Sequence, residues 1–153
     1  LAGGGFDISG AGNILQNETD SGIGGVMFFN SETDDGSDDF SDISFAGDND
    51  VILSAPTSGD YAGVLFFQDP DSDSAAASLE FSVSGEVDMQ LDGAVYLPDH
   101  DIDYSGTSSM SLRCTKLIGN TIEFSGTTGT DIPDSCASDA VTISNTTGVR
   151  LRG

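Results

Sequence analysis

The sequence contains a short repeat that restricts the folds open to it. In each copy two apolar residues flank one polar residue, and a small residue and then Gly or Asn follow. Such alternation is typical of a strand with one buried face, and Gly or Asn supplies a corner with positive φ. We therefore expect an all-β chain. The copies span residues 6–10, 43–47, 81–85, 102–106, 122–126 and 141–145.

The spacing of the copies predicts how the strands are stacked. The corner residues are Gly10, Gly47, Gly85, Gly106, Gly126 and Asn145, so the steps between them are 37, 38, 21, 20 and 19 residues. A period of about 20 residues is typical of one solenoid turn. Further apolar elements follow most corners, which predicts three strands per turn. We expect a right-handed parallel β-helix (β-solenoid) of about six coils, with residues 1–153 as a single domain.

The first two steps are longer because they contain polar insertions. These insertions span residues 30–42 and 68–78, are rich in Asp and Ser, and follow the expected third strand of their coils. Insertions on one face of a solenoid are expected to be loops.

The charge excludes several classes of partner. The chain has 26 acidic and 4 basic residues and a net charge of −22. The first 101 residues contain 21 of the acidic side chains and none of the basic ones. Such a surface repels nucleic-acid phosphates and anionic lipids, and no run of about 18 apolar residues occurs. We predict no nucleic-acid binding and no membrane insertion by this chain.

Residues 1–5 and the two cysteines favour an exported protein. The first residues show neither an initiator Met nor a signal-peptide pattern, which predicts a processed mature form or an excised domain. Cys114 and Cys136 lie 22 residues apart, which excludes a CxxC pair. We expect them to form one structural disulfide, with a reactive thiol as the alternative, and we expect an extracellular location, either secreted or on the cell surface.

No catalytic motif is evident. The chain shows none of the sequence patterns of serine hydrolases, zinc proteases or nucleotide-binding enzymes. The single histidine, His100, follows Pro98 between two expected strands and is predicted to lie in a solvated loop. The number of carboxylates leaves paired acids for glycoside hydrolysis open. We nevertheless predict that the chain is not an enzyme.

Two acidic stretches are candidates for calcium binding, because carboxylates alternate along them. Calcium takes six to eight oxygen ligands from such groups. Neither stretch completes an EF-hand, and the alternative is a solvated acidic surface. No other cofactor is expected. The candidate ligands are Asp69, Asp71, Asp73, Asp99, Asp101 and Asp103.

Several spaced motifs follow one another along the chain, at residues 55–69, 93–98, 104–106, 114–118 and 124–126. Their order resembles the C-terminal region of the TadG-like proteins associated with Tad (Flp) pili of bacteria. The resemblance covers roughly residues 43 to 151. It implies a cell-envelope or extracellular protein linked to surface filaments and attachment, and it brings no catalytic residues with it.

The two ends of the predicted stack suggest how copies associate. Phe6 and Ile8 lie near one end and Val149 and Leu151 near the other, without an evident polar cap. A head-to-tail contact of this kind propagates as a fibre. We therefore expect a structural subunit of a surface filament or pilus-related fibre.

Two other functions stay open. The first is a surface-displayed adhesin or a calcium- or glycan-binding module, using the inserted loops and Tyr61 or Tyr96. The second is a polysaccharide-active enzyme with carboxylates in a cleft beside a basic group. The absence of Lys and Arg before Ile102 argues against an acidic polysaccharide as the substrate of such an enzyme.

Overall fold

The computed structural model describes residues 5–15, 25–31, 41–69, 79–107, 109–112, 115–126 and 129–131. Every regular element in these ranges is a β-strand, and the same ranges contain no helix that could cross a membrane. The strands are β1 (Phe6–Ala11), β2 (Ile14–Leu15), β3 (Phe28–Asn30), β4 (Ile43–Asp48), β5 (Asp50–Ser54), β6 (Val64–Gln68), β7 (Leu79–Gly85), β8 (Asp88–Asp92), β9 (Ala94–Tyr104), β10 (Ser109–Leu112), β11 (Lys116–Phe124) and β12 (Gly129–Asp131).

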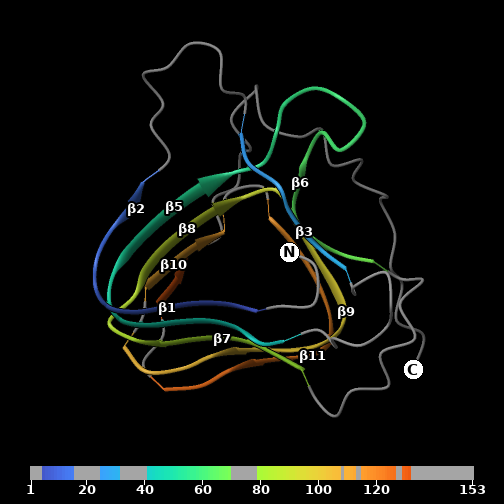
Figure 1. The fold of residues 1–153 in the computed structure, drawn as a ribbon. Coiled ribbons are helices and arrows are strands. Elements are labelled where there is room, and N and C mark those ends of the chain that lie inside the picture. Colours follow the sequence, from blue (N-terminus) through green and yellow to red (C-terminus); the bar gives the residue numbers. More distant parts are fainter. Residues whose placement is uncertain are drawn as a thin grey trace, which may run out of the picture.

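The strands form two parallel sheets around a common core. The larger sheet has the order β1-β4-β7-β9-β6-β3, with β11 also paired to β9, and the smaller sheet has the order β12-β10-β8-β5-β2. In Figure 1 the smaller sheet runs along one side of the core. The larger sheet curls around the rest, from the arm that contains β1 and β7 to the arm that contains β3 and β6.

The repeat copies pair with one another in register, as their pattern predicts. Parallel pairing aligns equivalent residues of the five described copies, so that apolar side chains form rows across the strands. The sixth copy, residues 141–145, lies outside the described residues. The two inner rows are Phe6–Ile43–Phe81–Ile102–Ile122 and Ile8–Phe45–Val83–Tyr104–Phe124.

The predicted right-handed parallel β-helix of about six coils is wrong. A three-faced solenoid needs three separate sheets, whereas the described strands form one curled sheet and one smaller sheet. The predicted three strands per turn placed residues 94–97 in the third strand of one turn and residues 102–104 in the first strand of the next turn. In the structure both belong to the single strand β9.

Strand β9 joins the two arms of the larger sheet because it bends without ending. Its first residues pair with β6 and its last residues pair with β7. Side chains alternate inward up to Leu97 and again from His100, so the alternation shifts by one residue at Pro98–Asp99. One additional residue of this kind bends a strand while its apolar side chains keep facing the core.

The core is apolar and rich in aromatic rings. Phe66 of β6 and Phe81 of β7 are both buried, and their rings meet edge to face with centroids 5.5 Å apart. This contact connects the two arms of the curled sheet across the interior. Burial of each such side chain contributes about 1.5–3 kcal/mol.

The insertions begin later than the sequence indicates. Asn30 and Gln68, the first residues of the predicted loops, are the last residues of β3 and β6, pair in register and are buried. Residues 32–40 and 70–78 lie outside the described residues.

Candidate functional site

The acidic residues of β9 point outward, and two of them, Asp99 and Asp101, accept hydrogen bonds within the sheet. Asp101 accepts hydrogen bonds from Thr121 Oγ1 at 2.6 Å and Asn120 Nδ2 at 2.9 Å. These bonds, that from Thr121 foremost, lower the pKa of the Asp101 carboxyl below its usual value. Asp99 Oδ2 accepts from Gln68 Nε2 at 2.8 Å. Asp99 and Asp101 are therefore engaged with neutral donors, whereas Oδ1 of Asp103 is buried without a partner among the described residues.

Among the residues that the structure describes, the candidate calcium ligands do not form one cluster. Asp99, Asp101 and Asp103 lie in sequence along one strand, and Asp69 follows β6, whereas Asp71 and Asp73 lie outside the described residues. Within the described ranges, no group of three or more His, Cys, Asp or Glu side chains is placed to hold a metal ion.

The predicted disulfide and one predicted end also lie outside the described residues, since these exclude Cys114, Cys136, Val149 and Leu151. The other predicted end is described. Phe6 and Ile8 are half-buried on β1, and Phe6 packs against the ring of Phe45 with centroids 5.7 Å apart.

The prediction that His100 lies in a solvated loop is wrong. His100 belongs to β9, points into the core and is 0% exposed. Gln68 Nε2 donates to the Asp99 carboxylate, which orients the Gln68 amide so that its Oε1 faces His100 Nδ1 at 3.1 Å. Gln68 Oε1 thus offers Nδ1 a hydrogen-bond acceptor, and no partner among the described residues meets hydrogen-bond geometry at the buried Nε2.

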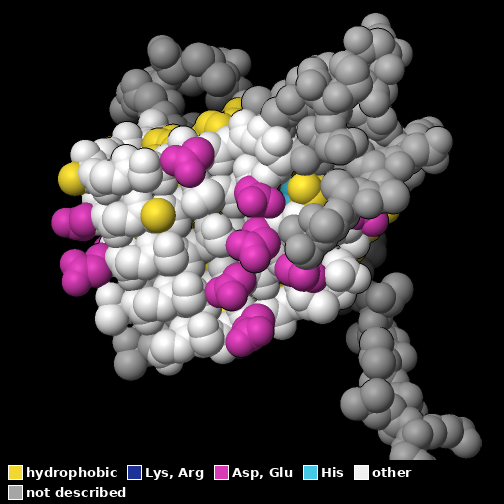
Figure 2. Space-filling view, turned by 60° about the horizontal axis from the view of Figure 1, so that its bottom comes forward, with side chains coloured by type: hydrophobic (Ala, Val, Ile, Leu, Met, Phe, Trp, Pro, Cys, Tyr) yellow, Lys and Arg dark blue, Asp and Glu magenta, His cyan; other side chains and the backbone are white. Residues whose placement is uncertain are grey.

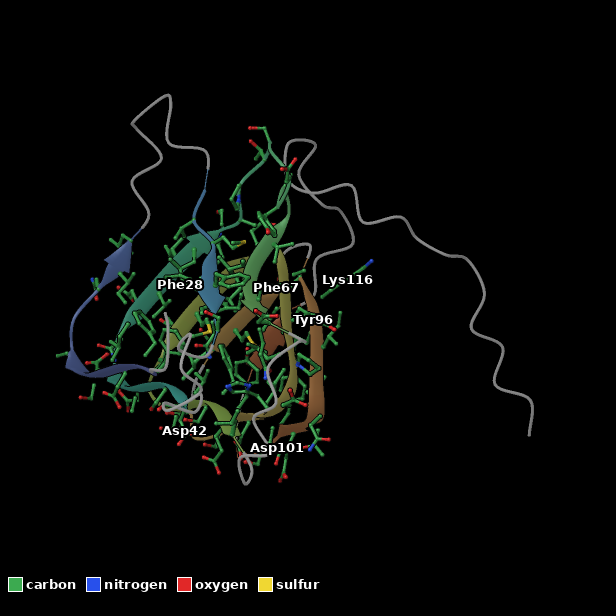
Figure 3. All side chains as sticks on the ribbon, turned by 45° about the vertical axis from the view of Figure 1, so that its right-hand side comes forward. Phe28, Asp42, Phe67, Tyr96, Asp101 and Lys116 are labelled. Atoms are coloured by element: carbon green, nitrogen blue, oxygen red, sulfur yellow. The ribbon has the colours of Figure 1, made fainter. Side chains whose placement is uncertain are left out.

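Burial lowers the pKa of His100, because desolvation disfavours the imidazolium ion. The backbone of Ser41 and the carboxylates of Asp42, Asp99 and Asp101 act in the opposite direction but do not outweigh burial. Figure 3 places Asp42 and Asp101 on the same lower side of the molecule. His100 is therefore a neutral, buried member of a polar cluster.

The sequence did not indicate the buried amide that His100 contacts. That amide belongs to Gln68, which pairs in register with Asn30. Both amides are buried, and each follows an aromatic pair and is the last residue of its strand. That shared position was the signal that they form a row. Both amide atoms of Asn30 are buried without a partner in the described part of the chain.

An aromatic row lies on the outer face of β3, β6 and β9. The rings of Phe29, Phe67 and Tyr96 stack with centroids 5.6 and 5.3 Å apart, and Tyr61 lies beside Phe67 at 6.4 Å. Figure 3 shows Phe67 and Tyr96 close together on this side. Because stacking covers the ring faces, the row is not a flat platform for a sugar, although Tyr61 is 51% exposed.

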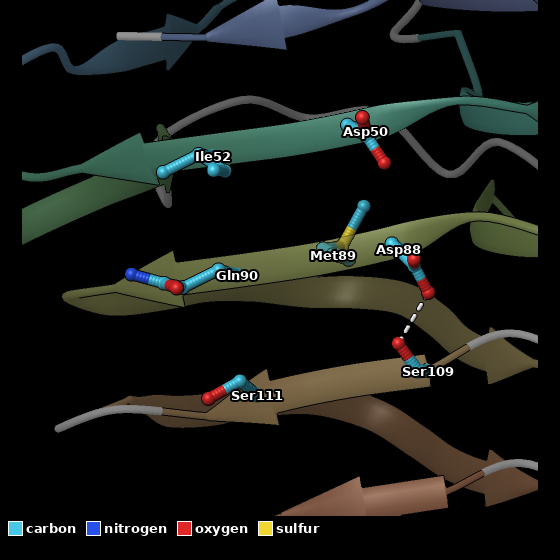
Figure 4. A pocket seen from close by; sticks show the side chains of 7 residues that line it. All are labelled: Asp50, Ile52, Asp88, Met89, Gln90, Ser109 and Ser111. Carbon is cyan, nitrogen blue, oxygen red and sulfur yellow. Dashed lines mark hydrogen bonds between the residues drawn. The ribbon is translucent and has the colours of Figure 1, made fainter.

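A shallow groove lies on the outer face of the smaller sheet. It has a volume of about 220 Å³ and is lined by β5, β8 and β10 (Figure 4). Ser109 Oγ donates a hydrogen bond to Asp88 Oδ1 within it. The lining residues are Asp50, Ile52, Asp88, Met89, Gln90, Ser109 and Ser111.

The outer face of the larger sheet is acidic. Figure 2 shows acidic side chains distributed over this face and no Lys or Arg among the described residues visible there. The outward acids come from four strands, so the charge is spread over the sheet. They are Asp7, Glu80, Asp101, Asp103 and Glu123.

At strand β11 the inner apolar rows become exposed. Ile122 and Phe124 pair with the buried Ile102 and Tyr104, yet they are 44% and 45% exposed. The ring of Phe124 stacks on that of Tyr104 with centroids 5.3 Å apart and an angle of 9°. Among the described strands, β11 pairs only with β9 and β1 only with β4, so the two strands are the edges of this arm.

The chain matches no protein-family model, and no curated protein or solved structure shows significant similarity to it.

Proposed function

We propose that the chain is a non-enzymatic, extracellular structural protein whose copies join head to tail in a surface filament. The observation that carries this proposal is the exposure of inner-row side chains at β11. Ile122 and Phe124 occupy positions that are buried in the preceding strand, so a further strand from another copy would cover them.

The opposite edge offers a matching surface. Phe6 and Ile8 are the first members of the same two rows and lie on β1, whose outer edge is unpaired within the described part of the chain. If β11 of one copy met β1 of the next, both apolar rows and the parallel hydrogen bonding would continue. Such a contact uses two different surfaces and does not close, so it propagates.

The charge distribution favours end-to-end association of copies over lateral association. The acidic outer face of the larger sheet repels the same face of another copy, which opposes lateral association. The basic residues of the chain all follow Ile102, so the more acidic part of one copy would meet the less acidic part of its neighbour. The resemblance to pilus-associated proteins supports the same function and an extracellular location.

A double substitution at the exposed edge tests the proposal. We expect the wild-type protein to sediment as a concentration-dependent series of oligomers and to form filaments in negative-stain electron micrographs. The axial repeat should be a multiple of about 4.8 Å, the spacing between paired strands. Ile122→Lys combined with Phe124→Lys should leave only monomers, because two charges would have to be buried in the contact.

Ile118→Lys is the matched control. Ile118 lies on the same strand and is 42% exposed, but it pairs with Tyr96 on the outer face and is not in the inner rows. This variant should assemble like the wild type. Monodisperse wild-type monomers at high concentration and high salt, where repulsion is screened, would contradict the proposal.

A further inference from the structure

We propose that the groove on the smaller sheet binds an uncharged oligosaccharide. The groove lies on a different sheet from the edges that carry the proposed assembly, so this inference does not depend on filament formation. Its lining residues form two rows across the strands, as the pairing register requires. The rows are Asp50–Asp88–Ser109 and Ile52–Gln90–Ser111.

The rows provide the groups that a sugar needs. The carboxylates of Asp50 and Asp88 accept hydrogen bonds from hydroxyl groups, while Gln90 and Ser111 both donate and accept. Ile52 gives the second row an apolar side chain against which the C–H groups of a sugar ring can pack. Neighbouring groups are spaced by about 4.8 Å across the strands. The groove therefore combines polar and apolar contacts at regular intervals.

Charge and polarity exclude anionic ligands and purely apolar ligands. None of the lining residues is basic, so two neighbouring carboxylates would repel a phosphate, a sulfate or a uronic acid. A purely apolar ligand would remove the same polar groups from water without replacing their hydrogen bonds. A calcium ion needs at least six oxygen ligands. Asp88 Oδ1 already accepts a hydrogen bond from Ser109. A neutral, hydroxyl-rich ligand fits these restrictions.

The size of the groove sets the expected strength of binding. Its volume of about 220 Å³ is below the roughly 300–1,000 Å³ of pockets that enclose a drug-sized ligand. The groove is also open, so a bound chain would keep most of its surface in water. Binding by one copy is therefore expected in the millimolar range.

Saturation-transfer difference NMR tests this inference, because it detects weak ligands on monomers and on filaments alike. The neutral probes are cellohexaose, maltohexaose and N-acetylchitohexaose, and the anionic probe is hexagalacturonate, all measured with a chelator present. At least one neutral probe should give signals, and hexagalacturonate should give none. Gln90→Ala should weaken binding about fivefold, the effect of one lost hydrogen bond.

Two lysine variants separate groove binding from contact elsewhere. Ile52→Lys places a long charged side chain in the groove and should abolish the signals, whereas Ile118→Lys on the other sheet should leave them unchanged. The inference is overturned if no neutral probe gives signals, if Ile52→Lys leaves them intact, or if hexagalacturonate binds as well. Because assembly is measured separately by sedimentation, failure of one proposal is distinguishable from failure of the other.

Discussion

Replacing Gly85 by alanine is expected to lower the free energy of unfolding by about 3 kcal/mol. Part of this cost is conformational: Gly85 has a φ of +89°, where an L-residue is strained by about 1–2 kcal/mol. The rest is steric. A Cβ atom at this position would lie 2.7 Å from the carbonyl oxygen of Gly47 in the neighbouring strand, and a backbone atom cannot move aside cheaply.

Gly10 is the matched control for this substitution. It occupies the same position in the first repeat copy and has a φ of +100°, but a Cβ atom there would meet nothing within 4 Å. Gly10→Ala should therefore cost only the conformational part, about 1–2 kcal/mol. Urea unfolding of both variants, followed by circular dichroism, gives the difference. Equal losses of stability would show that the close stacking of corner glycines is not the cause.

The stability of the protein is expected to fall as the pH drops below about 6.5. Because burial lowers the pKa of His100 in the folded state, the unfolded chain binds the proton more readily. Above pH 6.5 the His100 side chain is neutral in both the folded and the unfolded state, so its protonation does not reduce the free energy of unfolding there. Below that pH the free energy of unfolding should decrease by up to about 1.4 kcal/mol per pH unit, until the folded state is protonated as well.

Two variants test whether His100 is the group that causes this pH dependence. Urea unfolding between pH 8 and pH 5 should show a flatter profile for His100→Gln, because glutamine keeps a polar group but takes up no proton. Asp101→Asn should not flatten the profile in this range, because loss of a carboxylate that raises the pKa of His100 moves that pKa further down. The pKa of Asp101 is lowered, so its contribution is present above its ordinary value of 3.8 and is lost only at lower pH. An unchanged slope in His100→Gln would rule out His100 as the group responsible.

The fold was predictable as far as local patterns determine it. Alternation in residues such as Phe81, Ser82 and Val83 identified the strands and their buried faces, and the recurrence of the repeat with its corner glycine identified which strands pair. These predictions held because side chains alternate with a period of two and because a shift of one residue would expose the apolar face. The resemblance to TadG-like proteins, by contrast, stays a prediction.

The candidate sites were less predictable, because they depend on residues from several strands. Nothing in the local sequence indicated that Asp50, Gln90 and Ser111 would line one groove, since these polar residues lie 21 to 61 positions apart. Polar residues on outward positions are ordinary in any half-buried sheet. Only the register between β5, β8 and β10 makes them neighbours.

By itself, the sequence determined the all-β character of the described chain, its parallel register and the apolar composition of its core. The tertiary structure decided how many sheets form, because Pro98 and Asp99 bend β9 instead of ending it. It also decided that His100 is buried, since Gln68 Oε1, 32 positions away in the sequence and on another strand, offers its ring a hydrogen-bond acceptor. The physical reason is that alternation fixes which way a side chain faces, whereas bending and burial depend on long-range contacts.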